Sequence, residues 1–334
     1  MRELFTSFQR ACLRTCVILT TTFGLVFAAH AVDPDGFPAY VETLKAEARE
    51  HGISEEAIER AFADIRFYER AVSADRNQPE FTITLDTYLP RAVPDWKVQQ
   101  GIRKYEEHRE LLEEIGEKFG VQPRFIVALW GIETNYGGFT GNFRVVSALA
   151  TLAYEGRREA FFKRQLMQAL EIIDAGHIEP EQMRGSWAGA MGQTQFMPSS
   201  FLSYAVDFDG DGKIDIWNSF PDVFASAANY LSQVGWDDSK TWGRQVRIPE
   251  DFDTSVAGLS TKKSLSEWQA LGVRRFDGTD LPTRDIEASL IIPDDQTGRI
   301  YLAYHNWDVL MRWNRSNYFV VAVGHLADRI QMGR

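Results

Sequence analysis

The sequence predicts a mainly helical protein that carries one small β-containing region. Through most of the chain, apolar residues recur every three or four positions, as they do on one face of an α-helix, and Gly or Pro separates these runs. Between about residues 242 and 301 the pattern changes to short alternating runs, such as 245–248 and 288–292, among Pro, Gly and Asp turns. We therefore expect helices before and after a small strand-bearing insert.

The N-terminus has the composition of a secretory signal peptide. Basic residues precede an apolar run at 16–28, and the tripeptide Ala-His-Ala at 29–31 supplies a small-x-small cleavage pattern. The apolar run is short for a membrane-spanning helix, which favours cleavage over a retained anchor. Since Cys12 and Cys16 precede the cleavage point, we expect a soluble periplasmic protein, cleaved after about Ala31, without disulfides or a stable membrane anchor.

The charge of the chain excludes two classes of partner. The formal net charge is −11, and it becomes −13 when the leader takes away three basic residues and one acidic residue. Such a surface repels nucleic acid and anionic membranes, so we expect neither as a partner. Aromatic residues make up 13% of the chain, enough to line a sugar-binding groove as well as to fill a core.

The first part of the chain should consist of helices. The apolar stripe between Phe37 and Phe67 is interrupted at Gly52, and Ser54 has the residue type of an N-cap for a second helix. After a break at 78–81, Asp95 begins a charged segment with inward apolar residues up to Phe119. This segment predicts one long helix.

The helix that begins at Pro123 carries the strongest candidate for catalysis. Phe125 and Leu129 precede Glu133 at helical spacing, so Glu133 continues an otherwise apolar face. A carboxylate on a buried face is costly to ionise, which raises its pKa and lets it hold a proton near neutrality, as a general acid must. The alternative is a structural carboxylate bonded to a neighbouring backbone group or arginine.

A stretch of small residues follows further along the chain. Helices are expected at 145–153 and 160–175, with a short one starting at Pro180. The next segment, 184–200, is rich in Gly, Ala and Ser and contains no acid. Because glycine lets a backbone approach another backbone or a ligand, this segment is either a tight packing region or a wall that contacts substrate.

The stretch 207–218 has the ligand spacing of an EF-hand calcium loop. Acidic residues occupy positions 1, 3, 5 and 9, Gly212 at position 6 allows the sharp turn, and position 7 contributes a backbone carbonyl. At position 12, Asn218 replaces the usual bidentate Glu. We predict a structural Ca²⁺, with Na⁺ or a metal-free acidic turn as alternatives. The predicted ligands are Asp207, Asp209, Asp211, Lys213, Asp215 and, through a longer loop, Asp222.

The remaining segments are again mostly helical. A helix is expected at 224–234, a short one at 265–271 within the strand-bearing insert, and helical structure at 306–330 with a polar break at 313–316.

Five segments together resemble the lytic murein transglycosylase B family, in its soluble exported form. They are GIETNYG at 131–137, GSWAGAMGQTQFMPSS at 185–200, DFDGDGKID at 207–215, NY at 229–230 and WNRS at 313–316. The resemblance implies an elongated, mainly helical protein whose catalytic core is similar to goose-type lysozyme. It also implies non-hydrolytic cleavage of the β-1,4 bond between N-acetylmuramic acid (MurNAc) and N-acetylglucosamine (GlcNAc) in peptidoglycan glycan strands, which leaves 1,6-anhydroMurNAc ends.

The resemblance also implies domain limits. They are a signal peptide at 1–31, an N-terminal helical region at 32–120, the catalytic core at 121–240, a small β-containing region at 241–303 and a C-terminal helical segment at 304–334 that returns to the core.

The resemblance assigns roles to individual residues. Glu133 matches the single catalytic acid/base, and Ser186 and Asn314 match polar residues beside it and the substrate N-acetyl group. The expected groove lining is Tyr88, Gln195, Phe196, Met197 and Tyr230, and Arg157 and Arg158 match a basic pair that faces the peptide stems. The chain departs from the family at Gln193 and Trp313, where relatives carry other side chains.

The count of carboxylates agrees with this mechanism. Hydrolytic glycosidases generally need two carboxylates, whereas the segments around Glu133 and Ser186 offer one, so a substrate group must act as nucleophile and no catalytic cofactor is needed. The first alternative is a hydrolytic muramidase that uses a second acid such as Glu155. The others are a non-catalytic peptidoglycan-binding protein and a calcium-dependent regulator.

Overall fold

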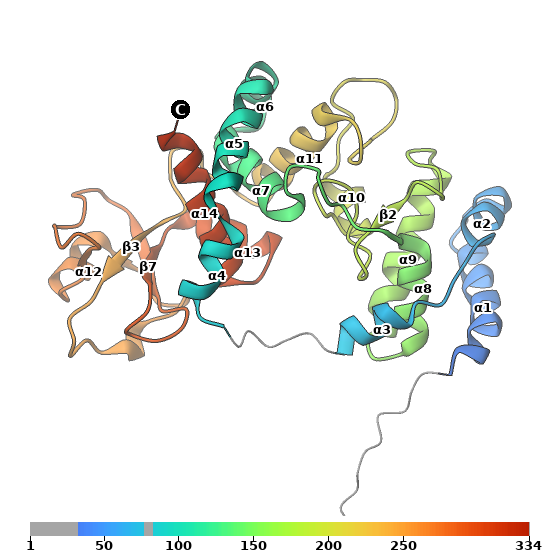
Figure 1. Ribbon diagram of the computed structural model, residues 1–334, viewed down its shortest axis with the longest axis horizontal. Helices are drawn as coiled ribbons and strands as arrows, with labels where there is room; N and C mark the ends of the chain where they lie inside the picture. Colours follow the sequence, from blue (N-terminus) through green and yellow to red (C-terminus); the bar gives the residue numbers. More distant parts are fainter. Residues whose placement is uncertain (1–32, 77–82, 334) are drawn as a thin grey trace, which may run out of the picture. The chain divides into compact units, whose positions relative to one another are not determined.

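The computed structural model describes residues 33–76 and 83–333, and Pro34–Arg334 form one compact unit (Figure 1). The predicted signal peptide and both cysteines lie outside the described residues. Within the described part of the chain, no helix is both long enough and apolar enough to cross a bilayer.

The described residues are mainly helical, which confirms the predicted fold class. The helices are α1 (Phe37–Glu50), α2 (Glu55–Phe62), α3 (Glu69–Arg76), α4 (Leu85–Ala92), α5 (Asp95–Glu107), α6 (Arg109–Phe119), α7 (Pro123–Thr134), α8 (Val145–Glu155), α9 (Glu159–Asp174), α10 (Pro198–Tyr204), α11 (Phe220–Gln233), α12 (Leu265–Ala270), α13 (His305–Trp313) and α14 (Asn317–Met332). The strands are β1 (Phe143–Arg144), β2 (Arg184–Gly185), β3 (Gly243–Arg247), β4 (Lys263–Ser264), β5 (Arg274–Arg275), β6 (Glu287–Ile291) and β7 (Ile300–Ala303).

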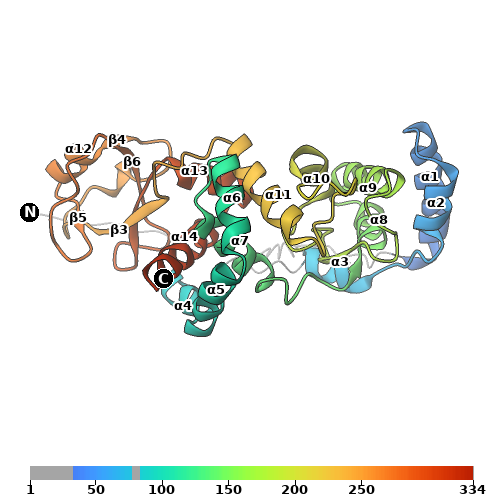
Figure 2. The same cartoon turned by 90° about the horizontal axis from the view of Figure 1, so that it is seen from above.

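Strands β3 to β7 form an antiparallel sheet in the order β4-β6-β7-β3-β5. Figure 2 shows them gathered with α12. This region has a core of its own, in which Leu290 pairs with Leu302 across β6 and β7 and the buried Trp268 of α12 donates its indole N–H to the Ala288 carbonyl at 2.8 Å. The strand-bearing insert expected from the alternating runs is therefore present.

Trp242, just before β3, attaches the sheet to the helices. Its ring stacks on Trp307 with centroids 5.5 Å apart, and its indole N–H donates to Asp328 Oδ2 at 3.0 Å. The same ring lies against Gly324 of α14, where an added Cβ would come within 2.1 Å of it. A glycine is required at this point because the ring occupies the space of any side chain.

Helix α7 is the central element for the site. Every residue from Phe125 to Gly131 is buried, because α7 packs against α5, α6, α11 and α14 (Figure 1). A helix that is apolar all round belongs inside a protein. The N-cap at Ser54, whose hydroxyl accepts the Ala57 N–H at 3.2 Å, and the Pro123 start are as expected from local signals.

Two predicted elements are wrong. The single helix expected from Asp95 to Phe119 is broken at His108, whose backbone leaves helical geometry (φ −114°, ψ 21°) while its ring packs 4.6 Å from that of Phe220. The short helix expected at Pro180 is a series of turns. Helices α3, α4 and α10 were not predicted, since each is short and lacks a clear apolar period.

Candidate active site

Glu133 lies in the last turn of α7, and the chain just after it is held in an unusual conformation. Asn135 and Tyr136 both have positive φ angles, 51° and 60°. The Tyr136 hydroxyl donates to the Lys97 carbonyl at 2.8 Å, and its ring lies where a side chain at Gly131 would be, 2.7 Å from an added Cβ. Left-handed backbone at non-glycine residues persists only where the surroundings enforce it, as these contacts do.

The Glu133 carboxyl group is partly buried and has one hydrogen-bond donor among the described side chains. The Trp313 indole N–H donates to Glu133 Oε1 at 2.6 Å. Burial raises the pKa of Glu133 from its ordinary 4.5 to about 7, and the Trp313 hydrogen bond opposes this rise because it stabilises the ionised form. A carboxyl with this pKa is half protonated near neutrality, so it can both give and accept a proton.

Trp313 is a functional candidate that sequence reasoning missed, since it was noted only as a departure from relatives. It also joins an aromatic cluster, with its ring centroid 5.3 Å from that of Phe196 and 4.8 Å from that of Tyr230. The Tyr230 hydroxyl donates to the Arg312 carbonyl at 2.8 Å. Three segments that are far apart in sequence thus meet beside Glu133.

Tyr88, on α4, also lies near Glu133. Burial raises the pKa of the Tyr88 hydroxyl, and the negative charge of Glu133 raises it further. The Tyr88 ring makes an edge contact with that of Tyr318, at a centroid distance of 5.3 Å. Tyr318 in turn donates its hydroxyl to the Ile83 carbonyl at 3.0 Å, which fixes the start of α4.

Gln193 is a buried brace between α7 and the 184–200 segment. Its Oε1 accepts the Trp130 indole N–H and its Nε2 donates to the Trp217 carbonyl, both at 2.8 Å. A Cβ at Gly137 would come within 2.3 Å of Gln193 Oε1. Gln193 therefore makes packing and hydrogen-bonding contacts inside the protein, which favours the tight-packing interpretation of this segment.

The neighbouring residues form a tight turn that presents Phe196. Met191 and Phe196 exchange two backbone hydrogen bonds, of 2.8 and 3.1 Å. Gln195, with φ 51°, donates its Nε2 to the carbonyls of Gly192 and Thr140 at 2.9 and 3.1 Å. Met197 follows as the N-cap of α10 and is half-buried.

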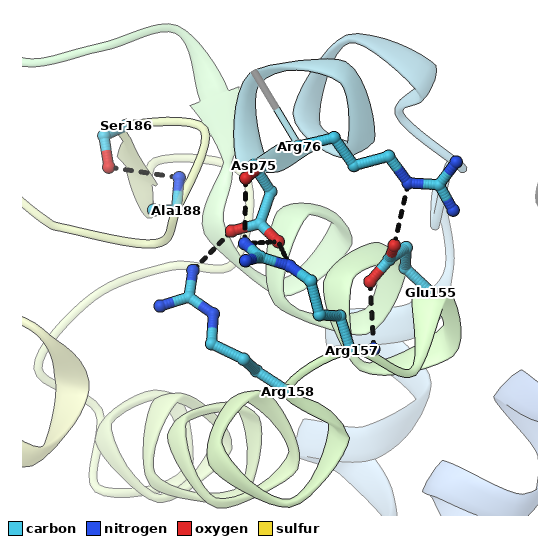
Figure 3. Close-up of polar contacts among 7 residues, drawn as sticks. All are labelled: Asp75, Arg76, Glu155, Arg157, Arg158, Ser186 and Ala188. Atoms are coloured by element: carbon cyan, nitrogen blue, oxygen red, sulfur yellow. Dashed lines mark hydrogen bonds and ion pairs between the residues drawn. The ribbon is translucent and has the colours of Figure 1, made fainter. Parts of the chain in front are cut away.

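Ser186 and Asn314 keep polar groups available. The Ser186 hydroxyl oxygen accepts the backbone N–H of Ala188 at 3.3 Å (Figure 3) and that of Ala190 at 3.0 Å, so its proton is left to donate. Asn314 is exposed and directly follows Trp313 at the end of α13. Neither side chain hydrogen-bonds to Glu133.

Arg157 and Arg158 bind a buried acid that sequence reasoning did not identify (Figure 3). Asp75 on α3 is 2% exposed; Arg157 reaches one of its carboxylate oxygens at 2.9 Å through Nε, and Arg158 contacts the other. Both arginine side chains are nevertheless about half exposed, at 49% and 40%. Asp75 could not be singled out from sequence because α3 itself was not predicted.

Glu155, considered above as a second acid, is already paired. Its carboxylate accepts the Arg76 Nε–H at 2.9 Å and the Arg157 backbone N–H at 3.0 Å, and its side chain is 5% exposed (Figure 3). An ion-paired, buried carboxylate is poorly suited to activate a water molecule.

The loop at 207–218 brings three carboxylates together. Oxygens of Asp207, Asp209 and Asp211 all lie within 4.8 Å of one another. Asp207 accepts the backbone N–H groups of Gly210 and Gly212 at 2.7 and 2.9 Å, which wraps the loop around it. Within residues 33–76 and 83–333, no Lys or Arg forms a salt bridge with these three acids. An unneutralised, all-oxygen donor set fits a hard cation such as Ca²⁺.

Asp222 is placed differently from the other predicted ligands. It is 1% exposed, and its two oxygens accept the backbone N–H groups of Phe208 and Asp215, at 2.7 and 2.8 Å. Burial raises its pKa, and these two hydrogen bonds oppose the rise. Asp222 therefore ties both sides of the loop together. Lys213 donates its backbone N–H to Asp211 at 2.8 Å.

Comparison with known proteins identifies relatives over most of the chain. The family described as "Transglycosylase SLT domain" matches residues 36–328. Membrane-bound lytic murein transglycosylase B of Escherichia coli (strain K12) is 34% identical over 255 residues, covering 74% of this chain and 67% of that protein.

Two solved structures show the same fold. SltB3 from Pseudomonas aeruginosa, in complex with NAG-anhNAM-pentapeptide, is 43% identical with a TM-score of 0.85, covering 88% of this chain and 79% of that one. The Escherichia coli lytic transglycosylase Slt35 in complex with calcium is 28% identical with a TM-score of 0.76, covering 88% and 93%. Because the family match spans nearly all of the described residues, the chain belongs to the lytic murein transglycosylase B family.

Proposed function

We propose that this lytic transglycosylase cleaves the MurNAc–GlcNAc β-1,4 bond of peptidoglycan without water, with Glu133 as acid and then as base. The observation that carries this proposal is the Glu133 carboxyl group itself, which has a pKa of about 7 and lies among aromatic side chains. The ligand in the SltB3 complex, NAG-anhNAM-pentapeptide, contains an anhydro sugar, and such a sugar is the product expected of this reaction.

In the first step, protonated Glu133 gives its proton to the glycosidic oxygen, and the bond from that oxygen to C1 of MurNAc breaks. The substrate N-acetyl carbonyl stabilises the positive charge at C1. Ionised Glu133 then takes the proton of the C6 hydroxyl, whose oxygen bonds to C1 and closes the 1,6-anhydro ring. The first proton leaves with the GlcNAc hydroxyl and the C6 proton replaces it on Glu133, so the enzyme is regenerated and no water is consumed.

The surrounding residues assist these steps. Trp313 stabilises the ionised carboxylate between the two proton transfers, and Ser186, with a hydroxyl proton left to donate, orients the N-acetyl group together with the exposed Asn314. The aromatic groove binds the glycan through Tyr88, Gln195, Phe196, Met197 and Tyr230. Arg157 and Arg158 offer their exposed faces to peptide stems while binding Asp75.

A calcium ion would brace the 207–218 loop. Asp207, Asp209, Asp211 and Asp215 and the Lys213 carbonyl would hold it, with Asp222 as a further carboxylate beneath. The ion would supply positive charge that offsets three clustered carboxylates. We further propose export by the leader at 1–31 and action in the periplasm.

The test is digestion of purified sacculi with wild type and Glu133→Gln. The wild type should release fragments with anhydro ends, identified by mass spectrometry, and Glu133→Gln should release none above background. Release of fragments with reducing ends would support a hydrolytic muramidase instead. Undiminished release by Glu133→Gln would refute the assignment of Glu133.

A further inference from the structure

A small cavity of about 10 Å³ is lined in part by Glu133. Most of its wall is apolar and comes from α7 and α11, with Leu129, Val223 and Phe224 among the lining residues. This volume is about the smallest that holds one water molecule, and such a cavity takes up water only where polar groups face it.

Thr194 supplies such a polar group. It lines the same cavity as Glu133, it is 3% exposed, and its hydroxyl oxygen has no hydrogen-bond partner among the described residues. Buried hydroxyl groups nearly always have a partner, because an unmade hydrogen bond is costly away from solvent. Gln193 also lines the cavity, but its Oε1 bonds to Trp130 and its Nε2 to Trp217 rather than to Thr194.

The Glu133 carboxylate, in turn, has an oxygen that can accept a hydrogen bond. Trp313 donates to Oε1, whereas no described residue donates to Oε2. One oxygen of the carboxylate is thus oriented by Trp313, and the other has no donor among the described residues of the protein.

We propose that Thr194 is a positioning residue for Glu133, acting through a single water molecule in this cavity that bonds to the Thr194 hydroxyl and donates to Glu133 Oε2. The proposal rests on the proposed role of Glu133 as acid and base. With both oxygens held, the carboxyl group keeps one orientation through its two proton transfers, and the water stabilises the ionised state between them.

Burial raises the pKa of Glu133, and the Trp313 hydrogen bond opposes that rise. The helices packed around α7 carry titratable groups that include Lys97 of α5, Asp222 and Tyr230 of α11 and His325 of α14. The negative charge of Glu133 raises the pKa of the Tyr88 hydroxyl on α4. Burial, Trp313 and the proposed water should dominate the titration of Glu133.

The test compares Thr194→Val, which removes the hydroxyl at nearly constant volume, with Thr194→Ser, which keeps it. In Thr194→Val the high-pH limb of kcat/KM for anhydro-product release should move up by about one pH unit, since one hydrogen bond to the carboxylate is lost. We expect kcat to fall about tenfold with KM unchanged, and Thr194→Ser to match wild type.

A wild-type pH profile and kcat in Thr194→Val would overturn the proposal, as would Thr194→Ser behaving like Thr194→Val. If Thr194→Val does not fold, a high-resolution crystal structure of the wild type decides. Water density about 3 Å from both Thr194 Oγ1 and Glu133 Oε2 is the expected result, and a dry cavity overturns the proposal. Loss of activity in Glu133→Gln with no effect of Thr194→Val would refute only the Thr194 inference.

Discussion

Replacing Trp313 with phenylalanine removes the hydrogen bond to Glu133 Oε1 while keeping an aromatic ring in place. The ring contacts of Trp313 with Phe196 and Tyr230, at centroid distances of 5.3 and 4.8 Å, should largely survive in the smaller side chain. The substitution therefore acts mainly on one N–H group that lies 2.6 Å from the carboxylate.

The magnitude follows from the two influences on the Glu133 pKa. Burial raises this pKa to about 7 even though the Trp313 hydrogen bond opposes it. A hydrogen bond to a charged group stabilises it by roughly 1.5–3 kcal/mol, and about 1.4 kcal/mol corresponds to one pH unit. Water that enters the vacated space recovers part of this energy, so we expect the pKa to rise by about one pH unit, to about 8.

The assay is the pH dependence of anhydro-product release from sacculi. The high-pH limb of kcat/KM, where Glu133 loses the proton it must donate, should move up by about one unit in Trp313→Phe. Below that limb kcat should fall, because the ionised intermediate has lost a stabilising donor. Trp96→Phe is the control, since Trp96 is 55% exposed on α5, and it should leave the profile unchanged. A high-pH limb that stays in place in Trp313→Phe would refute this account of the Glu133 pKa.

Three further outcomes are expected. Glu133→Gln should stabilise the fold by about 3 kcal/mol at pH 8 and by little at pH 4. The folded-state pKa of Glu133 is raised from 4.5 to about 7, so its favourable contribution to stability is present below pH 4.5 and lost as pH rises through 7. Equal melting temperatures of mutant and wild type at pH 8 would contradict this. Chelation by EDTA should lower the melting temperature of the wild type, and adding Ca²⁺ should restore it. In Asp209→Asn, added Ca²⁺ should restore the melting temperature less well. A melting temperature that does not respond to Ca²⁺ would count against a calcium ion that braces the 207–218 loop. Asp75→Asn should cost about 2 kcal/mol by urea unfolding because it leaves two arginines without their buried counter-charge. Asp64→Asn, which removes an acid exposed to solvent beside Arg66 and Arg144, should cost much less. Similar costs for both would exclude a special role of Asp75.

Local signals in the sequence were sufficient for most of the helices that shape the site. Ser54 caps α2 and Pro123 starts α7, because caps and proline act on the backbone within one turn of themselves. The break at His108 was not predictable in this way. Helix periodicity continues through it, and the ring of His108 leaves the helix to pack on Phe220, which lies more than 100 residues away in sequence.

In the candidate site, too, the residues that local sequence patterns identify differ from those that only the fold brings together. Glu133 could be singled out because its spacing from Phe125 and Leu129 puts a carboxyl group on an apolar face, and the rise in its pKa follows from burial. The three acids of the 207–211 turn could be singled out by spacing alone. In both cases the residues that form the pattern lie within about ten positions of each other in the sequence, so their spacing can be recognised without the fold.

The partners of these residues depend on the tertiary structure. Trp313 donates to a carboxylate 180 positions away, and Arg157 and Arg158 reach Asp75 across more than 80 positions. Residues so far apart in sequence are brought together only by packing of helices against a common core, and no local pattern records which side chains then come within hydrogen-bond distance. The sequence by itself thus singled out Glu133 as the candidate acid, while the tertiary structure decided which donor orients its carboxyl group and which other carboxylates are already paired with arginines.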